Sequence, residues 1–136
     1  MKLRIAILVF GLIIISMGDV YGAEWKFHGS NEKALAYYDA QSITRPSKNI
    51  VRVWVRTNYT EKGVIYMVGE FGKKYEDLSN DITLYEINCV EKMIHPLSGT
   101  FYDNGGGQIY TSSSPLEWDF IIPDSMSESL YKEVCK

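Results

Sequence analysis

The two cysteines have the most specific chemistry in this sequence. Cys89 lies in the strand-like stretch LYEINC, and Cys135 is the second-to-last residue. Two cysteines in an exported chain are typical of a disulfide. Neither His28 nor His95 has the spacing from a cysteine that a metal site or a thiol–histidine pair would suggest. We favour a disulfide, while two free core thiols or a catalytic thiol stay open as alternatives.

A second candidate site lies in IVRVWVRTNY, residues 50–59, where three valines alternate with Arg52, Trp54 and Arg56. Successive side chains of a strand point to opposite faces, so the valines should face the core and the other three should not. Two guanidinium groups around an indole could bind an acidic or glycan-bearing partner. The commoner interpretation is a solvated strand face, or one covered by a helix near residues 64–75.

Other features of the sequence argue against catalysis and nucleic-acid binding. A net charge of −3 gives no basic footprint for nucleic acid. The stretch GGGQ lacks the lysine and hydroxyl residue of a phosphate-binding loop, and no nucleophile or paired-carboxylate motif stands out. Trp118 is more typical of a cover over a core edge than of a ligand-stacking aromatic. The sequence therefore predicts a protein that is not an enzyme, with no cofactor and no metal site.

The first 22 residues have the layout of a secretory signal peptide. Lys2 and Arg4 precede an apolar run at residues 5–15, and small residues lead to Gly22. The run is short for a bilayer-spanning helix, which needs about 20 apolar residues. We expect cleavage after Gly22, or after Ala23, to leave one domain without a membrane span.

The remaining chain, residues 23–136, is expected to be one compact, β-rich domain. Period-two patterns and turn residues predict strands at residues 23–29, 34–43, 50–59, 82–92, 93–103 and 108–113. Residues 44–49 have turn chemistry. Pro96 predicts a bulge or an edge, and Asn104-Gly105 predicts a hairpin because these residues tolerate positive φ.

Two helices are expected, one in the middle of the chain and one at its end. The first spans residues 63–81 and frays near Gly72, with Ile65, Val68, Phe71 and Tyr75 on one face. The second is capped by Ser125 and carries an apolar stripe of Met126, Leu130 and Val134, with Cys135 beside it. We expect the valines of residues 50–59 to pack against this second helix.

Six stretches spread over nearly the whole of residues 23–136 follow the order of a known family. They are YYDAQSI, VRVWVR, LYEINC, YDNGGG, SSSPLEWDFIIP and SLYKEVCK. Together they resemble the surface-adhesin protein E family of small bacterial envelope proteins. The resemblance implies an α+β fold, in which an antiparallel sheet packs against a C-terminal helix held by a Cys89–Cys135 bond. The central helix would be a further, short one.

The resemblance also bears on function, since the named member of the family is an adhesin that binds host matrix and serum proteins. We expect an exported, non-catalytic, adhesin-like binding protein, located in the periplasm or at the bacterial surface. Its partner would be a protein or a glycan, and a homodimer is open. The alternative is a small periplasmic ligand carrier or enzyme, which would show a cleft with convergent titratable groups.

Overall fold

The computed structural model describes residues 23–136, which form an α+β domain. The expected signal peptide, residues 1–22, lies outside the described residues. The elements are β1 (Trp25–Ser30), β2 (Ala34–Asp39), β3 (Thr44–Ser47), β4 (Ile50–Tyr59), α2 (Glu61–Phe71), a short 3-10 turn η2 (Lys73–Tyr75), β5 (Leu78–Asn88), β6 (Met93–Asp103), β7 (Gln108–Ser112), β8 (Asp119–Phe120) and α3 (Met126–Val134). No helix within residues 23–136 has both the length and the apolar character to cross a bilayer.

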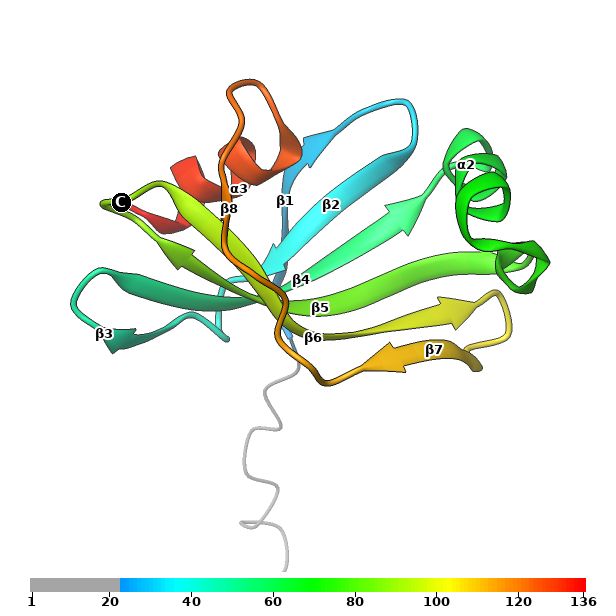
Figure 1. Ribbon diagram of the computed structural model, residues 1–136, viewed down its shortest axis with the longest axis horizontal. Coiled ribbons are helices and arrows are strands. Elements are labelled where there is room, and N and C mark those ends of the chain that lie inside the picture. The colour runs from blue at the N-terminus through cyan, green and yellow to red at the C-terminus, as the bar shows by residue number, and fades with distance from the viewer. Residues whose placement is uncertain (1–22) are drawn as a thin grey trace, which may run out of the picture.

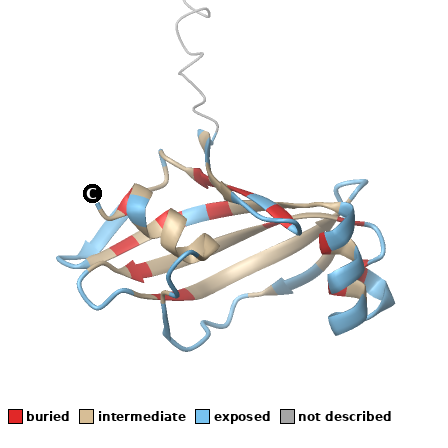
Figure 2. Cartoon of the chain, turned by 90° about the horizontal axis from the view of Figure 1, so that it is seen from above, coloured by how far each residue is buried: buried red, intermediate tan, exposed pale blue. Residues whose placement is uncertain are grey.

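The eight strands of the described chain form one antiparallel sheet (Figure 1). Its order is β1-β2-β4-β5-β6-β7, with β3 also paired to β4 and β8 also paired to β6. Both helices lie on the same side of this sheet, at opposite ends, and Figure 2 looks down on that side. The sequence prediction of an antiparallel sheet with a C-terminal helix and one further helix is confirmed.

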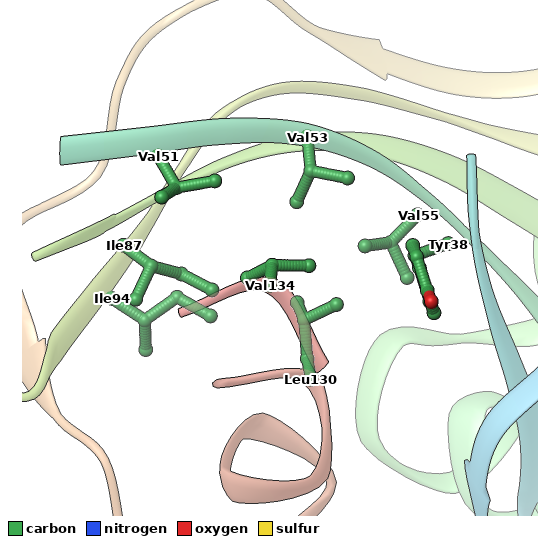
Figure 3. Packing of buried hydrophobic residues seen from close by; sticks show 8 residues of the cluster. All are labelled: Tyr38, Val51, Val53, Val55, Ile87, Ile94, Leu130 and Val134. Carbon is green, nitrogen blue, oxygen red and sulfur yellow. The ribbon is translucent and has the colours of Figure 1, made fainter. Parts of the chain in front are cut away.

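The main core lies between the sheet and α3, as the alternation in β4 predicts. Val51 and Val53 are fully buried, and Leu130 and Val134 of α3 are 2% and 3% exposed. Figure 3 shows these side chains meeting across the interface. The full buried cluster is Tyr38, Val51, Val53, Val55, Ile87, Ile94, Leu130 and Val134.

The ends of α3 are fixed by two local features. The Ser125 hydroxyl accepts a hydrogen bond from the Glu128 amide, which caps the helix as expected. At the other end Cys135 is bonded to Cys89, with the two Cα atoms 5.6 Å apart. The predicted disulfide is present. The strand itself ends at Asn88, earlier than the expected 92, because the chain turns directly after it.

The central helix differs from the expectation in both its limits and its buried face. It begins at Glu61, where Thr60 caps it, and ends at Phe71. Val68 and Tyr75 of the predicted face pack in a second core cluster as expected, but Ile65 is 65% exposed and Phe71 is 59% exposed, so the prediction is wrong for these two residues. Gly63 sits against the backbone of residue 33, where an added Cβ would lie 2.0 Å from a carbonyl oxygen. This close approach fixes the rotation of α2.

Three smaller expectations concern turns. Residues 44–49 were expected as a turn, but Thr44–Ser47 pairs irregularly with β4, and only residues 48 and 49 form the turn. A register shift in the β5–β6 pairing beside Pro96 is the predicted bulge. The β6–β7 hairpin is also present, although the positive φ of 82° falls on Gly106 and not on Asn104 or Gly105.

Candidate functional site

The strand register places Arg52, Trp54 and Arg56 on the face of the sheet that is opposite to α2 and α3. We call this face the open face. Residues paired across antiparallel strands share a face, and these three pair with Glu86, Leu84 and Ile82 of β5. In the described chain both helices pack on the other face, so α2 does not cover these side chains. The interpretation of this patch as a surface beneath the central helix is therefore wrong.

Trp54 lines a shallow hollow on the open face. The indole is 36% exposed, and the hollow of about 320 Å³ is also lined by Trp25, Asp39, Ile82, Thr100 and Tyr102. A second aromatic pair lies nearby on the same face, since Phe27 contacts Tyr37 edge-on at 5.7 Å between ring centroids. Because Tyr37 is the cross-strand neighbour of Arg56, aromatic and cationic groups are contiguous here.

The two arginines have different surroundings. Arg52 donates from Nε and Nη2 to one carboxylate oxygen of Glu86, at 3.2 and 2.8 Å. Arg56 donates from Nε to Asn58 Oδ1 at 3.0 Å, and it makes no salt bridge within residues 23–136. The charge of Arg52 is therefore neutralised in the sheet, whereas the charge of Arg56 is available to a partner.

Arg52 belongs to a polar network that the sequence did not reveal. Glu86 also accepts from His95 Nε2 at 2.9 Å, while His95 Nδ1 lies 2.9 Å from the carbonyl of Leu116. Burial acts to raise the pKa of Glu86, but hydrogen bonds from Arg52 and His95 outweigh it and hold the pKa below its usual value. Both ring nitrogens of His95 therefore face acceptors, one from Glu86 and one from Leu116.

Trp118 completes this network. Its ring stacks on that of His95, with centroids 3.8 Å apart and planes at 24°. Trp118 therefore covers a buried histidine at the edge of the sheet, close to its expected role over a core edge. The network ties the irregular segment before β8 to β5 and β6.

The other face of the sheet holds a groove between the two helices. Its floor includes Asp81 of β5, which is only 6% exposed and accepts hydrogen bonds from the hydroxyl groups of Tyr59 and Thr83. Burial raises the pKa of Asp81 to about 6, against the opposing effect of these two hydrogen bonds. A cleft with a titratable group is what the alternative hypothesis of a ligand carrier expects.

The described residues contain no group of three or more histidine, cysteine or acidic side chains placed to hold a metal ion. Asp81 and Glu86 were missed in the sequence, and His95 was set aside because no partner lies near it in the sequence. These side chains reach their hydrogen-bond partners through the register of neighbouring strands, which no local sequence pattern indicates.

Comparison with known proteins gives one result for the whole domain. A family model described as Surface-adhesin protein E matches residues 25–136. No curated protein matches the chain.

Proposed function

The chain belongs to the surface-adhesin protein E family, and from this premise we propose that it is an exported, non-catalytic binding protein of the cell envelope. Family membership supports an adhesin-like protein at the cell surface. The proposal has two further parts: export with cleavage after Gly22 or Ala23, and a partner that carries acidic groups on a protein or glycan. N-terminal sequencing of secreted protein should therefore begin at Ala23 or Glu24.

The observation that carries the proposal is the exposed indole of Trp54 beside Arg56, a cation that makes no salt bridge within residues 23–136. An indole over a hollow can stack on a sugar ring or pack on an apolar side chain of a partner. The guanidinium of Arg56 matches the geometry of a carboxylate, which it can bind with two hydrogen bonds. Together these groups favour a carboxylate-bearing protein or glycan.

Arg52 has a supporting role in this proposal. Two of its nitrogens are held by Glu86, yet its side chain is still 41% exposed. It therefore presents a fixed, partly neutralised guanidinium on the far side of Trp54 from Arg56. Its contact with a partner should be weaker and less salt-dependent than that of Arg56.

The experiment uses residues 23–136 against a panel of purified matrix and serum proteins and of acidic and neutral glycans. We expect the domain to capture one acidic protein or glycan of this panel. Arg56→Gln should weaken that binding by roughly tenfold, which corresponds to about 1.4 kcal/mol of binding free energy. The control is Lys62→Gln, which removes an exposed cation from α2 on the other side of the sheet. Equal losses for both variants, or no loss for Arg56→Gln, would show that the open face is not the binding surface.

A further inference from the structure

A second region of the molecule has the properties of a ligand site, and it lies on the opposite side of the sheet from Trp54. Its groove measures about 360 Å³, within the range of about 300–1,000 Å³ of small-molecule sites. Strands β4 to β7 and the segment after β7 line it. The lining includes Tyr59, Asp81, Phe101, Tyr110, Ser112 and Leu116.

Asp81 gives this groove its chemistry. One carboxylate oxygen accepts from Tyr59, and the other accepts from Thr83 at 2.9 Å. Both donors are neutral hydroxyl groups, and no salt bridge to Asp81 occurs within the described chain. The carboxylate is therefore oriented without being neutralised, so a cation entering the groove would supply its missing counter-charge.

The walls of the groove are aromatic around this carboxylate. Tyr59 and Phe101 lie with ring centroids 6.4 Å apart, and Phe101 also meets Tyr75 edge-on at 5.5 Å. Tyr85 lies four residues after Asp81 on the same strand face and lines the groove as well. An ammonium ion suits this groove better than a metal ion, because aromatic rings attract a cation and Asp81 is the one carboxylate among the residues that line the groove.

Beyond Asp81 the groove continues toward α3 into a hollow of mixed lining, in which Asp119, Ser125 and Ser127 lie beside apolar side chains. Tyr85, Pro96 and Leu116 line both this groove and an adjoining hollow of about 700 Å³, in which Phe120 and Ile122 also lie. Phe120 is 76% exposed and Ile122 is 68% exposed. Figure 2 shows the strands of this face running between the two helices. A ligand could therefore place an apolar part along these residues.

We propose that this groove binds an alkylammonium group, with the ammonium at Asp81 and the alkyl part along Leu116 toward Ile122. The group could belong to a free amine or to a lysine side chain of a protein. The inference is independent of the proposed role of the open face, since it depends on residues of the other face.

The energetics of Asp81 support this assignment. Burial raises its pKa to about 6, so the ionised carboxylate opposes folding at neutral pH. The titratable groups that face it are Tyr59 and Tyr85, whose pKa values are also raised by burial, so both stay neutral at pH 7. Titratable groups with strongly shifted pKa values cluster in clefts at functional sites, which supports a ligand role for this carboxylate beside the groove.

The test titrates residues 23–136 with hexylammonium at pH 7.5 and follows backbone amide signals by NMR. Saturable shifts are expected at Asp81, Thr83 and Leu116. The affinity for 1-hexanol should be at least about tenfold weaker, because 1-hexanol lacks the charge.

A short peptide with one lysine among leucines distinguishes a protein lysine from a free amine as the source of the ammonium group. Tighter binding of this peptide than of hexylammonium assigns a protein lysine, and the reverse order assigns a free amine. No saturable binding of either probe would overturn the proposal.

Two variants locate the site. Asp81→Asn keeps the shape of the side chain and should weaken hexylammonium at least about tenfold. Ser112→Leu should block the groove, since Ser112 lies opposite the small Gly99 on the groove face. Thr111→Leu is the matched control, because its side chain points to the open face from the same strand. Unchanged affinity in Asp81→Asn, or equal losses in the two β7 variants, would overturn the proposal. Trp54→Ala should leave hexylammonium binding unchanged, because Trp54 lies on the open face. This result would show that the groove is a site distinct from the open face.

Discussion

Strand β4 has two faces with opposite character, although their residues alternate in the sequence. Val51 and Val53 have no exposed surface, and α3 covers them. Their neighbour Trp54 is 36% exposed, and no helix of the described chain packs on it. The covered face, on which both helices pack, therefore carries the core of the domain, and we propose recognition for the open face because no helix of the described chain covers it.

The difference between the faces has a covalent component. The disulfide joins the end of β5 to the end of α3, and the Tyr131 hydroxyl donates to the Cys89 carbonyl at 3.1 Å beside it. Both contacts hold α3 against the valine face. On the open face of the described residues, the comparable link is the hydrogen-bond network of Glu86 with Arg52 and His95, at one end of the sheet.

The largest effect is expected from removing the disulfide. The bond spans 46 residues, and the chain-entropy model gives about 4 kcal/mol for a loop of this size. The double variant Cys89→Ser/Cys135→Ser should lose about this much unfolding free energy in guanidinium titrations. Wild-type protein treated with reductant should fall to the same stability, and the variant should not respond to reductant. A loss below about 1 kcal/mol would show that α3 docks without the bond.

The next effect tests packing on the covered face alone. Leu130→Ala should destabilise the domain by about 2–5 kcal/mol, because it leaves a cavity against Val53 and Val55. The control is Ile65→Ala, which removes a side chain that is 65% exposed on α2 and should change stability by about 0.5 kcal/mol or less. Similar losses for both variants in urea titrations would contradict the burial of Leu130 as a main source of stability.

A smaller, pH-dependent effect is expected at Asp81, the polar exception on the covered face. Its pKa of about 6 lies above its ordinary value of 3.8, so protonation favours the folded state and stability due to this group should rise as pH falls from about 6 to 4. The shift corresponds to about 3 kcal/mol at most. Asp81→Asn should therefore be more stable than wild type at pH 7, and this difference should shrink by pH 4.

Unfolding free energies of both proteins at pH 7 and pH 4.5 test this prediction. Taking the difference between the proteins removes the opposing contribution of Glu86, whose pKa is lowered and whose contribution is lost in acid. A variant less stable than wild type at pH 7 would show that the carboxylate supports the fold.

Much of the framework could be predicted from the sequence because it depends on local patterns. The alternation in β4 predicted which side chains are buried, and the Ser125 cap and apolar stripe predicted α3. The disulfide followed from the number of cysteines and the expected export. Each of these features requires only neighbouring residues or residue counts.

The remaining features depend on contacts between distant segments. Arg52 meets Glu86 across a separation of 34 residues, and only the β4–β5 register brings them together. The rotation of α2 follows from the approach of Gly63 to the turn before β2, which no helical periodicity indicates. The position of β3 was missed because Pro46 and its polar neighbours are typical of a turn. For the same reason only the Trp54 patch, and not the Asp81 groove, could be proposed from the sequence.

The smallest expected effect on stability belongs to the central claim, that the open face binds the acidic partner while the core beneath α3 stabilises the fold. Trp54→Ala should shift unfolding free energy by about 1 kcal/mol or less, yet abolish capture of the acidic partner bound by residues 23–136. Trp118→Ala is the matched control, since its indole has the same exposure of 36% but stacks on His95. Both quantities should be measured on both variants. Lost binding with retained stability for Trp54→Ala, and retained binding for Trp118→Ala, is the predicted result. A loss of about 3–5 kcal/mol for Trp54→Ala, typical of a core tryptophan, would contradict the account.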